Sequence, residues 1–79
     1  MFQYNYSIIL LYVNIIMINQ NIKRLRKKRG FSQDKLCKMA DLTHTTLAKI
    51  ESGVNTNPTI KTLQKIAKAL EVSLNELVK

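Results

Sequence analysis

Very few side chains in this sequence are of the types that carry out catalysis or bind metal ions. The chain has one cysteine, Cys37, one histidine, His44, and 5 acidic residues among 79. It offers no pair of carboxylates, no nucleophile beside a base and no glycine-rich phosphate loop. A lone cysteine forms neither an internal disulfide nor a zinc site. We therefore expect no enzyme activity, no catalytic residue, no metal, no cofactor, and a reducing, cytoplasmic location.

The basic side chains are the chemically informative ones. The chain has 13 Lys and Arg against 5 Asp and Glu, a formal net charge of +8. Six of the seven residues from Lys23 to Arg29 are basic, whereas residues 1–22 carry no charge. Such an imbalance is typical of proteins that meet nucleic acid or an anionic membrane surface. A chain of this length forms at most one small domain, which excludes a large buried substrate cleft.

These side chains must be positioned by short helices, because from Ile18 onward apolar residues recur at helical spacing between start and stop signals. The signals are, in chain order, Gly30, Ser32, Thr43, Gly53, Pro58 with Thr59, and Ser73 with Glu76 as a capping box. The expected buried stripes are Ile18, Ile22 and Leu25; Leu36, Met39 and Ala40 with Cys37 between them; Leu47 and Ile50; Ile60, Leu63, Ile66, Ala67 and Leu70; and Leu74 and Leu77. The pattern predicts an all-α, compact five-helix bundle.

The second and third expected helices are joined by a short turn, residues 41–43, after the second helix ends at Ala40. A turn of this length is typical of motifs that place a recognition helix in the DNA major groove. The surrounding motifs are residues 25–33 (LRKKRGFSQ), Leu36, Leu47, residues 50–53 (IESG), Pro58 and residues 65–70 (KIAKAL). Together they resemble the phage-repressor and Cro (XRE) helix-turn-helix family over residues 18–78. The resemblance implies a lambda-repressor-like fold with a central helix-turn-helix.

The resemblance also implies roles for individual residues. The positions that match base-contacting ones are Thr43, His44, Thr45, Thr46 and Lys49. Gln33 and Ser52 match phosphate-contacting positions, and Arg26 and Glu51 match a structural ion pair. The residue types fit these roles, because threonine suits the thymine methyl group and lysine suits the acceptors of guanine.

Two packing positions depart from the family pattern. Cys37 replaces the common alanine and Asp41 replaces the common turn glycine. Cysteine is small enough for close helix packing, and aspartate tolerates a positive φ better than most residues. The loop of residues 54–57 lacks the basic residues that many relatives carry there.

The apolar segment 1–17 is set apart from a DNA-binding domain at 18–79, and three interpretations of it stay open. In the first interpretation, translation begins at Met17, and residues 1–16 are a mis-assigned start. Alternatively, residues 2–18 anchor the chain in a membrane, since basic residues follow them directly, although the run from Ser7 to Ile18 is short of the roughly 20 apolar residues that a span needs. In the third interpretation, the segment packs on the domain or on a partner subunit.

The resemblance therefore implies a sequence-specific regulator of transcription that binds double-stranded DNA, with the third helix, residues 43–52, in the major groove. One recognition helix reads only a few base pairs, so we expect a homodimer, assembled mainly on DNA, on a palindromic operator. The candidates for its dimer surface are Asn57, Pro58, Leu74 and Val78. The alternatives are a membrane-tethered DNA-binding protein and a protein-interaction module such as an antitoxin partner.

Overall fold

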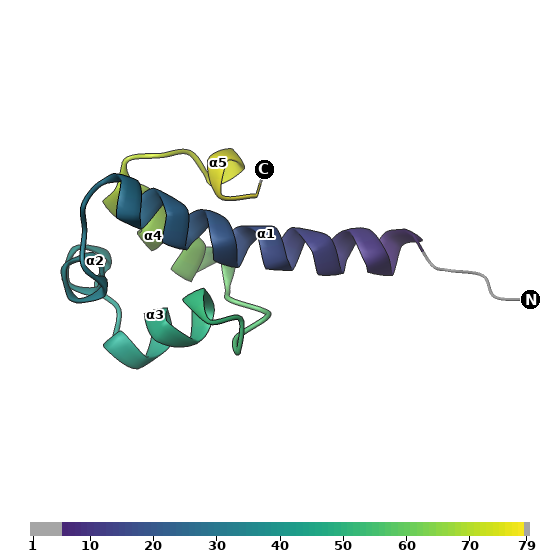
Figure 1. Cartoon of the computed structure of the whole chain (residues 1–79), viewed down its shortest axis with the longest axis horizontal. Coiled ribbons are helices and arrows are strands. Elements are labelled where there is room, and N and C mark those ends of the chain that lie inside the picture. The colour runs from purple at the N-terminus through teal and green to yellow at the C-terminus, as the bar shows by residue number, and fades with distance from the viewer. Residues whose placement is uncertain (1–5, 79) are drawn as a thin grey trace, which may run out of the picture.

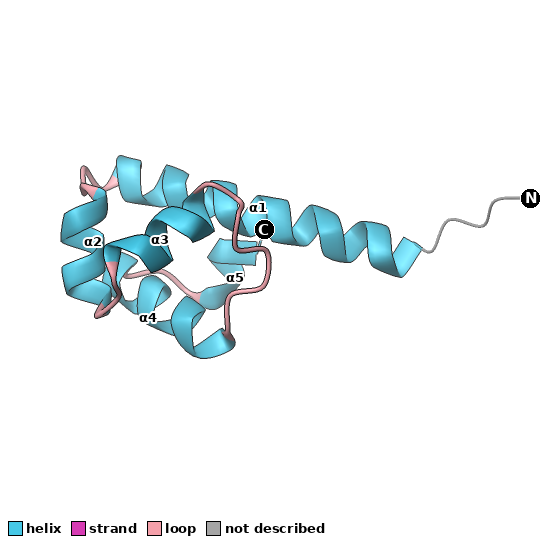
Figure 2. Cartoon of the chain, turned by 90° about the horizontal axis from the view of Figure 1, so that it is seen from below, coloured by secondary structure: helices cyan, strands magenta, loops and turns pink. Residues whose placement is uncertain are grey.

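The computed structural model describes the backbone of residues 6–78 and the side chains of residues 17–78. Helices are the only regular elements in this part of the chain (Figures 1 and 2). They are α1 (Tyr6–Lys28), α2 (Gln33–Ala40), α3 (His44–Glu51), α4 (Ile60–Leu70) and α5 (Leu74–Val78). The predicted all-α, five-helix fold is confirmed.

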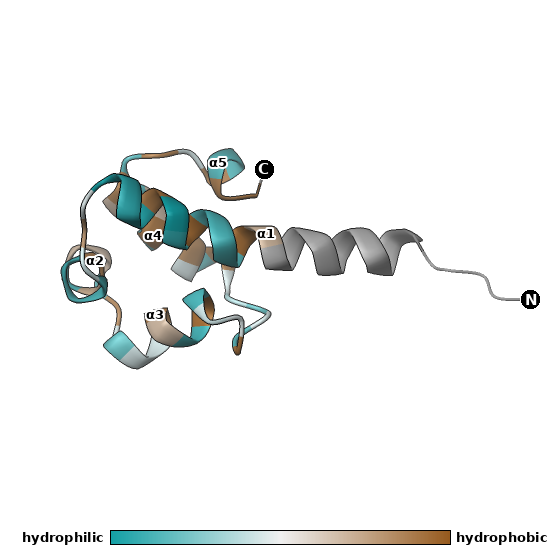
Figure 3. Ribbon diagram, viewed as in Figure 1, coloured by the Kyte–Doolittle hydropathy of each residue, from teal (hydrophilic) through white to brown (hydrophobic). Residues whose placement is uncertain are grey.

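The C-terminal half of α1 is the central element of the bundle. It contacts α3, α4 and α5, while α2 packs against α3 and α4. In Figure 1, α3 lies below α1, α5 lies above it and α4 lies behind it. Figure 2, seen from below, shows α3 between α1 and α4. The visible outer face of the last turns of α1 is mostly hydrophilic (Figure 3), as expected for the side of the helix that faces away from the core.

The first helix is longer than the sequence pattern suggested. We expected it from about Ile18, but α1 begins at Tyr6 and runs unbroken for 23 residues. The segment from Tyr6 to Ile18 contains no glycine or proline that would end a helix, and its β-branched residues lower helix propensity only slightly. The separation of residues 1–17 from the domain stays a prediction, and residues 1–5 lie outside the described part. None of the described helices, α1 included, has the length and hydropathy needed to cross a membrane.

The hydrophobic core follows the predicted stripes with two exceptions. The buried apolar residues are Ile22, Leu25, Leu36, Cys37, Ala40, Leu47, Ile50, Leu63, Ile66, Ala67, Ala69, Leu70 and Leu77. The predictions for Met39 and Ile60 are wrong, since these residues are 49% and 64% exposed. In α2, the core side is made by Leu36, Cys37 and Ala40, and Met39 falls outside it. Ile60 is the first residue of α4, one turn before its first buried residue, Leu63.

The N-termini of four helices are fixed by local capping hydrogen bonds, at the residues that the sequence predicted. The hydroxyls of Ser32, Thr43 and Thr59 each accept a bond from the backbone N–H three residues later, at 3.0, 3.2 and 3.1 Å. The Ser73 hydroxyl does the same for Glu76 at 3.3 Å. Each cap satisfies a donor that the first turn of a helix leaves without a partner, so the starts of α2 to α5 are fixed locally.

Positive φ angles mark the ends of the helices. Gly30 and Gly53 have φ of 72° and 83°. Asp41, after α2, and Glu71, after α4, adopt the same left-handed region at 55° and 57°. The expected positive φ at Asp41 is confirmed, whereas that at Glu71 was not anticipated. A residue with a side chain is strained in this region, so the turn between α2 and α3 carries a conformational cost.

Candidate nucleic-acid interface

The first turn of α3 is organised by two threonines. The Thr43 hydroxyl caps the helix and lies 2.7 Å from the hydroxyl of Thr46. Thr46 is half-buried, whereas Thr43 stays exposed. The two hydroxyl groups are thus hydrogen-bonded to each other. Thr43 therefore has a structural role as the helix cap, in addition to any contact with a partner.

The outward side of α3 is formed by exposed side chains that do not pack into the core of the described part of the chain. His44, Thr45 and Lys49 are exposed. Thr45 and Lys49 are four residues apart and therefore share one face of the helix. The structure places all five predicted base-contacting residues on α3 or directly before it, and these three form its most accessible side. Such a convex polar surface can offer hydroxyl, imidazole and ammonium groups to a partner.

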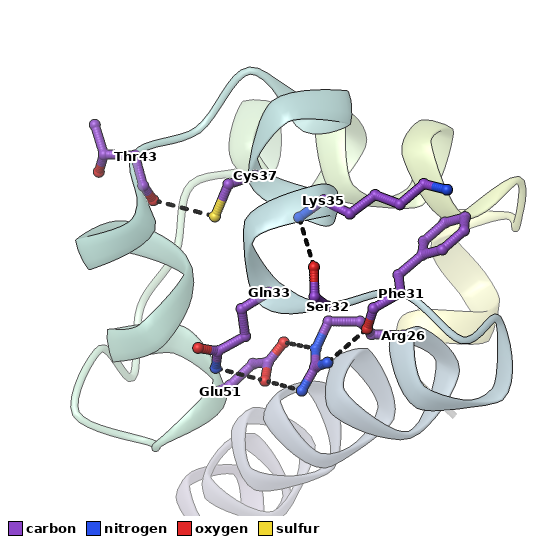
Figure 4. A network of polar contacts seen from close by, with 8 residues as sticks. All are labelled: Arg26, Phe31, Ser32, Gln33, Lys35, Cys37, Thr43 and Glu51. Atoms are coloured by element: carbon purple, nitrogen blue, oxygen red, sulfur yellow. Dashed lines mark hydrogen bonds and ion pairs between the residues drawn. The ribbon is translucent and has the colours of Figure 1, made fainter.

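Tight packing holds the two helices of the motif together. Leu47 and Ile50 on α3 are fully buried against the core. Cys37 on α2 is also buried, and its Sγ donates to the carbonyl oxygen of Thr43 at 3.6 Å (Figure 4). Burial raises the pKa of the Cys37 thiol, with smaller contributions in the same direction from Asp34 and Glu51. The cysteine therefore acts as a small, neutral packing residue that ties α2 to the start of α3.

An ion pair fixes the other end of α3. Arg26 donates through Nε to Glu51 Oε2 at 2.7 Å and through Nη2 to Oε1 at 3.0 Å (Figure 4). A third bond, from Nη1, reaches the carbonyl oxygen of Phe31 at 2.7 Å. The Arg26 and Glu51 side chains are only 10% and 3% exposed. This arrangement joins α1, the α1–α2 turn and the end of α3 into one unit.

Gln33 and Ser52, the expected phosphate-contacting residues, are each linked to Glu51 or its neighbours at the end of α3. Gln33 Nε2 donates to Glu51 Oε1 at 3.1 Å, and Ser52 directly follows Glu51. Ser52 is exposed and its hydroxyl donates to the carbonyl oxygen of Lys49 at 3.3 Å. The side chain of Gln33 is thus partly engaged in the fold. Its amide nitrogen carries a second hydrogen for an outside acceptor.

The basic cluster from Lys23 to Arg29 is not one uniform patch. Lys23, Arg24, Lys27 and Lys28 are exposed, whereas Arg26 is buried in its ion pair. Arg29 is bonded to Glu71 at 2.7 Å in a solvent-exposed pair. The outward charge of α1 therefore comes mainly from the four exposed residues.

Two buried asparagines on α1 were missed by the sequence analysis. Asn21 Nδ2 donates to the carbonyl oxygen of Leu77 at 3.0 Å and so holds α5 against α1. Asn19 is 6% exposed and lies beside Gly53, where a Cβ added to the glycine would come 3.7 Å from Asn19 Nδ2. The available signal was the residue type, since asparagine is a poor helix former and its presence inside a helix indicates a task for the side chain.

Comparison with known proteins is consistent with this geometry. A family model described as helix-turn-helix matches residues 22–77. The HTH-type transcriptional regulator SlrR of Bacillus subtilis is 41% identical over 61 residues, and SinR of the same species is 39% identical over 62. These matches cover 77% and 78% of this chain but 40% and 56% of the relatives. The chain thus spans about half the length of the relatives it matches.

Solved structures extend the similarity to three dimensions. The N-terminal DNA binding domain of SinR from Bacillus subtilis superposes with a TM-score of 0.77 at 38% identity, covering 81% of this chain and 93% of that one. A crystal structure of SinR in complex with DNA gives the same TM-score and identity, with 80% and 100% coverage.

Proposed function

Because this chain belongs to the helix-turn-helix family, we propose that it binds double-stranded DNA and regulates transcription. The expected membership of the XRE type follows from the match over residues 22–77 and from the likeness to SinR. Regulation through DNA needs no catalytic group, in keeping with the side chains available in the described part of the chain.

The observation that carries the proposal is the exposed side of α3. Its exposed residues are His44, Thr45 and Lys49. The start of α3 is held by the hydrogen bond from the Cys37 thiol to the Thr43 carbonyl oxygen, and its end is held by the Arg26–Glu51 ion pair. A rigid helix with a polar outer face is suited to the major groove, where threonine meets thymine methyls and lysine meets guanine acceptors. We propose that α3 reads base edges and that Gln33 and Ser52 contact phosphates near the end of the reading helix.

The phosphate role of Gln33 and Ser52 is supported by their position. Both lie near the end of α3, beside Glu51. The backbone N–H groups at the start of α2 add a partial positive charge there. The exposed Lys23, Arg24, Lys27 and Lys28 supply further positive charge that attracts DNA over a longer range.

Selection of bound sites from a pool of random duplex DNA tests the proposed function. We expect the full chain to enrich a defined sequence, and an excess of unrelated duplex to compete poorly. Affinity for the selected site should fall with rising salt, because phosphate contacts release counterions. A chain that binds no duplex, or binds every duplex equally at all salt concentrations, would contradict sequence-specific binding.

The two alternatives that the sequence left open predict different outcomes. A protein-interaction module binds through the same basic face without enriching any DNA sequence. A membrane-tethered protein sediments with membranes when cells are fractionated. The solved complex of SinR with DNA favours the DNA-binding proposal over the first of these alternatives.

A further inference from the structure

We propose that Glu51 is a positioning residue for DNA binding, whose buried carboxylate fixes the side-chain amide of Gln33 for contact with one phosphate of the duplex. The hold of Glu51 on Gln33 belongs to the domain without DNA. Only the use made of it, the contact with a phosphate, rests on the proposed function.

The first observation is that the Glu51 carboxylate has a fixed orientation. Arg26 donates to its Oε2 through Nε at 2.7 Å and to its Oε1 through Nη2 at 3.0 Å. The guanidinium is anchored in turn by its bond to the carbonyl oxygen of Phe31, and the Glu51 side chain is only 3% exposed. Two parallel hydrogen bonds between planar groups define one mutual orientation. Oε1 of Glu51 therefore faces any further donor in a set direction.

The second observation is that Gln33 is this further donor. Its Nε2 donates to Glu51 Oε1 at 3.1 Å (Figure 4). A glutamine amide can stand either way round, with its oxygen or its nitrogen toward a neighbour. The carboxylate of an ion pair only accepts hydrogen bonds, so it repels the amide oxygen and holds the nitrogen. Glu51 thus decides which way round the Gln33 amide stands, and Nε2 keeps one hydrogen for an acceptor outside the fold.

The remaining hydrogen of Gln33 Nε2 suits a phosphate, whose oxygens only accept. Gln33 is half-buried and is the first residue of α2, at the helix end where backbone N–H groups attract anions. A long side chain that is already held loses little rotamer freedom when it binds. The negative charge of Glu51 does not oppose the phosphate strongly, because Arg26 neutralises it and the fold covers it.

A purely structural role is the alternative interpretation, in which the bond from Gln33 to Glu51 only fastens α2 to α3. These two helices already pack on each other and bury side chains in one common core. The two interpretations differ in one measurable respect. Only positioning makes the strength of a single phosphate contact depend on Glu51.

The hold of Glu51 on Gln33 is tested on the full chain without DNA. Nitrogen-15 NMR observes the two hydrogens of the Gln33 side-chain amide. We expect the hydrogen that faces Glu51 to be shifted from its position in the unfolded chain. Glu51→Asp withdraws the carboxylate by one methylene and should move the signal back. Glu71→Asp, in the exposed pair with Arg29, is the matched control and should leave it unchanged.

The contact with a phosphate is tested on duplexes that carry the selected site with one phosphate at a time replaced by an uncharged methylphosphonate. At one position, the replacement should weaken binding of the unchanged chain about tenfold more than binding of Gln33→Ala, because only the unchanged chain makes that hydrogen bond. Glu51→Asp should reduce this difference to less than about threefold. Glu71→Asp should keep the full tenfold difference.

Thermal unfolding is recorded for every variant, and binding is measured below all midpoints. A folded Glu51→Asp that keeps the tenfold difference would overturn the proposal, as would unshifted Gln33 amide signals in the unchanged chain. So would a scan in which no phosphate separates the unchanged chain from Gln33→Ala.

If Glu51→Asp does not fold, Gln33→Asn replaces it in the same scan. Its amide is one methylene too short to reach Glu51 and the phosphate together, so the tenfold difference should again be lost. A Gln33→Asn chain that keeps this difference contradicts positioning by Glu51. A chain that binds no duplex at all refutes the proposed function, whereas the amide signals decide separately whether Glu51 holds Gln33.

Discussion

Arg26 on α1 and Glu51 at the end of α3 are joined by two hydrogen bonds, and both side chains are shielded from solvent. Removing either partner leaves the other charge buried and uncompensated. We therefore expect Arg26→Ala or Glu51→Ala to lower the free energy of unfolding by about 3–5 kcal/mol. Chemical denaturation of the single and double variants forms a double-mutant cycle. Strictly additive losses would show that the two residues are not coupled.

The chain offers a matched control for this pair. Arg29 and Glu71 are also 2.7 Å apart, but their side chains are 39% and 73% exposed. Water and salt screen such a pair, so Arg29→Ala should cost less than about 1 kcal/mol. A similar cost for Arg29→Ala and Arg26→Ala would mean that burial is not what makes the first pair important.

The Cys37 thiol makes the free energy of unfolding depend on pH in the alkaline range. Burial raises its pKa in the folded state. Stabilisation is therefore complete below the ordinary thiol pKa and is lost as the pH rises toward the folded-state value, because the unfolded chain ionises first. We expect Cys37→Ala to remove this part of the alkaline decline while keeping the fold. Identical alkaline profiles for the two proteins, measured by denaturation at several pH values, would contradict this role.

The left-handed residue between α2 and α3 predicts a stabilising substitution. Asp41 has a φ of 55°, which strains any residue with a Cβ. Asp41→Gly should raise the free energy of unfolding by about 0.5–1 kcal/mol, since relief of strain exceeds the extra freedom of glycine in the unfolded chain. Asp41→Val should lower it. Thermal unfolding measures both, and a destabilised Asp41→Gly would show that the aspartate side chain has a role of its own.

Local signals in the sequence predicted most of the fold. Ser32, Thr43 and Thr59 begin their helices as expected, since a cap depends on residues within one turn. The apolar spacing also identified most of the core. It failed at Met39 and Ile60, because spacing shows which face of a helix is apolar but not how far the neighbouring helices cover it.

The rest depended on contacts between residues far apart in the chain. Neither the bond from Gln33 to Glu51 nor that from Asn21 to Leu77 has a local sequence signal. The start of α1 was missed for a different reason. The apolar segment before Ile18 was read as a separate region because its composition changes there, yet composition does not end a helix.

The assignment of α3 as the reading helix is tested most directly by selecting binding sites with three single variants. We expect Thr45→Ala and Lys49→Ala to change which bases are preferred within each half-site, with each lost base contact costing about 1–3 kcal/mol. Gln33→Ala should weaken binding to all sites about equally and keep the preferred sequence, because phosphates carry no direct sequence information. Unchanged preferences for Thr45→Ala and Lys49→Ala, together with a shifted preference for Gln33→Ala, would contradict the account.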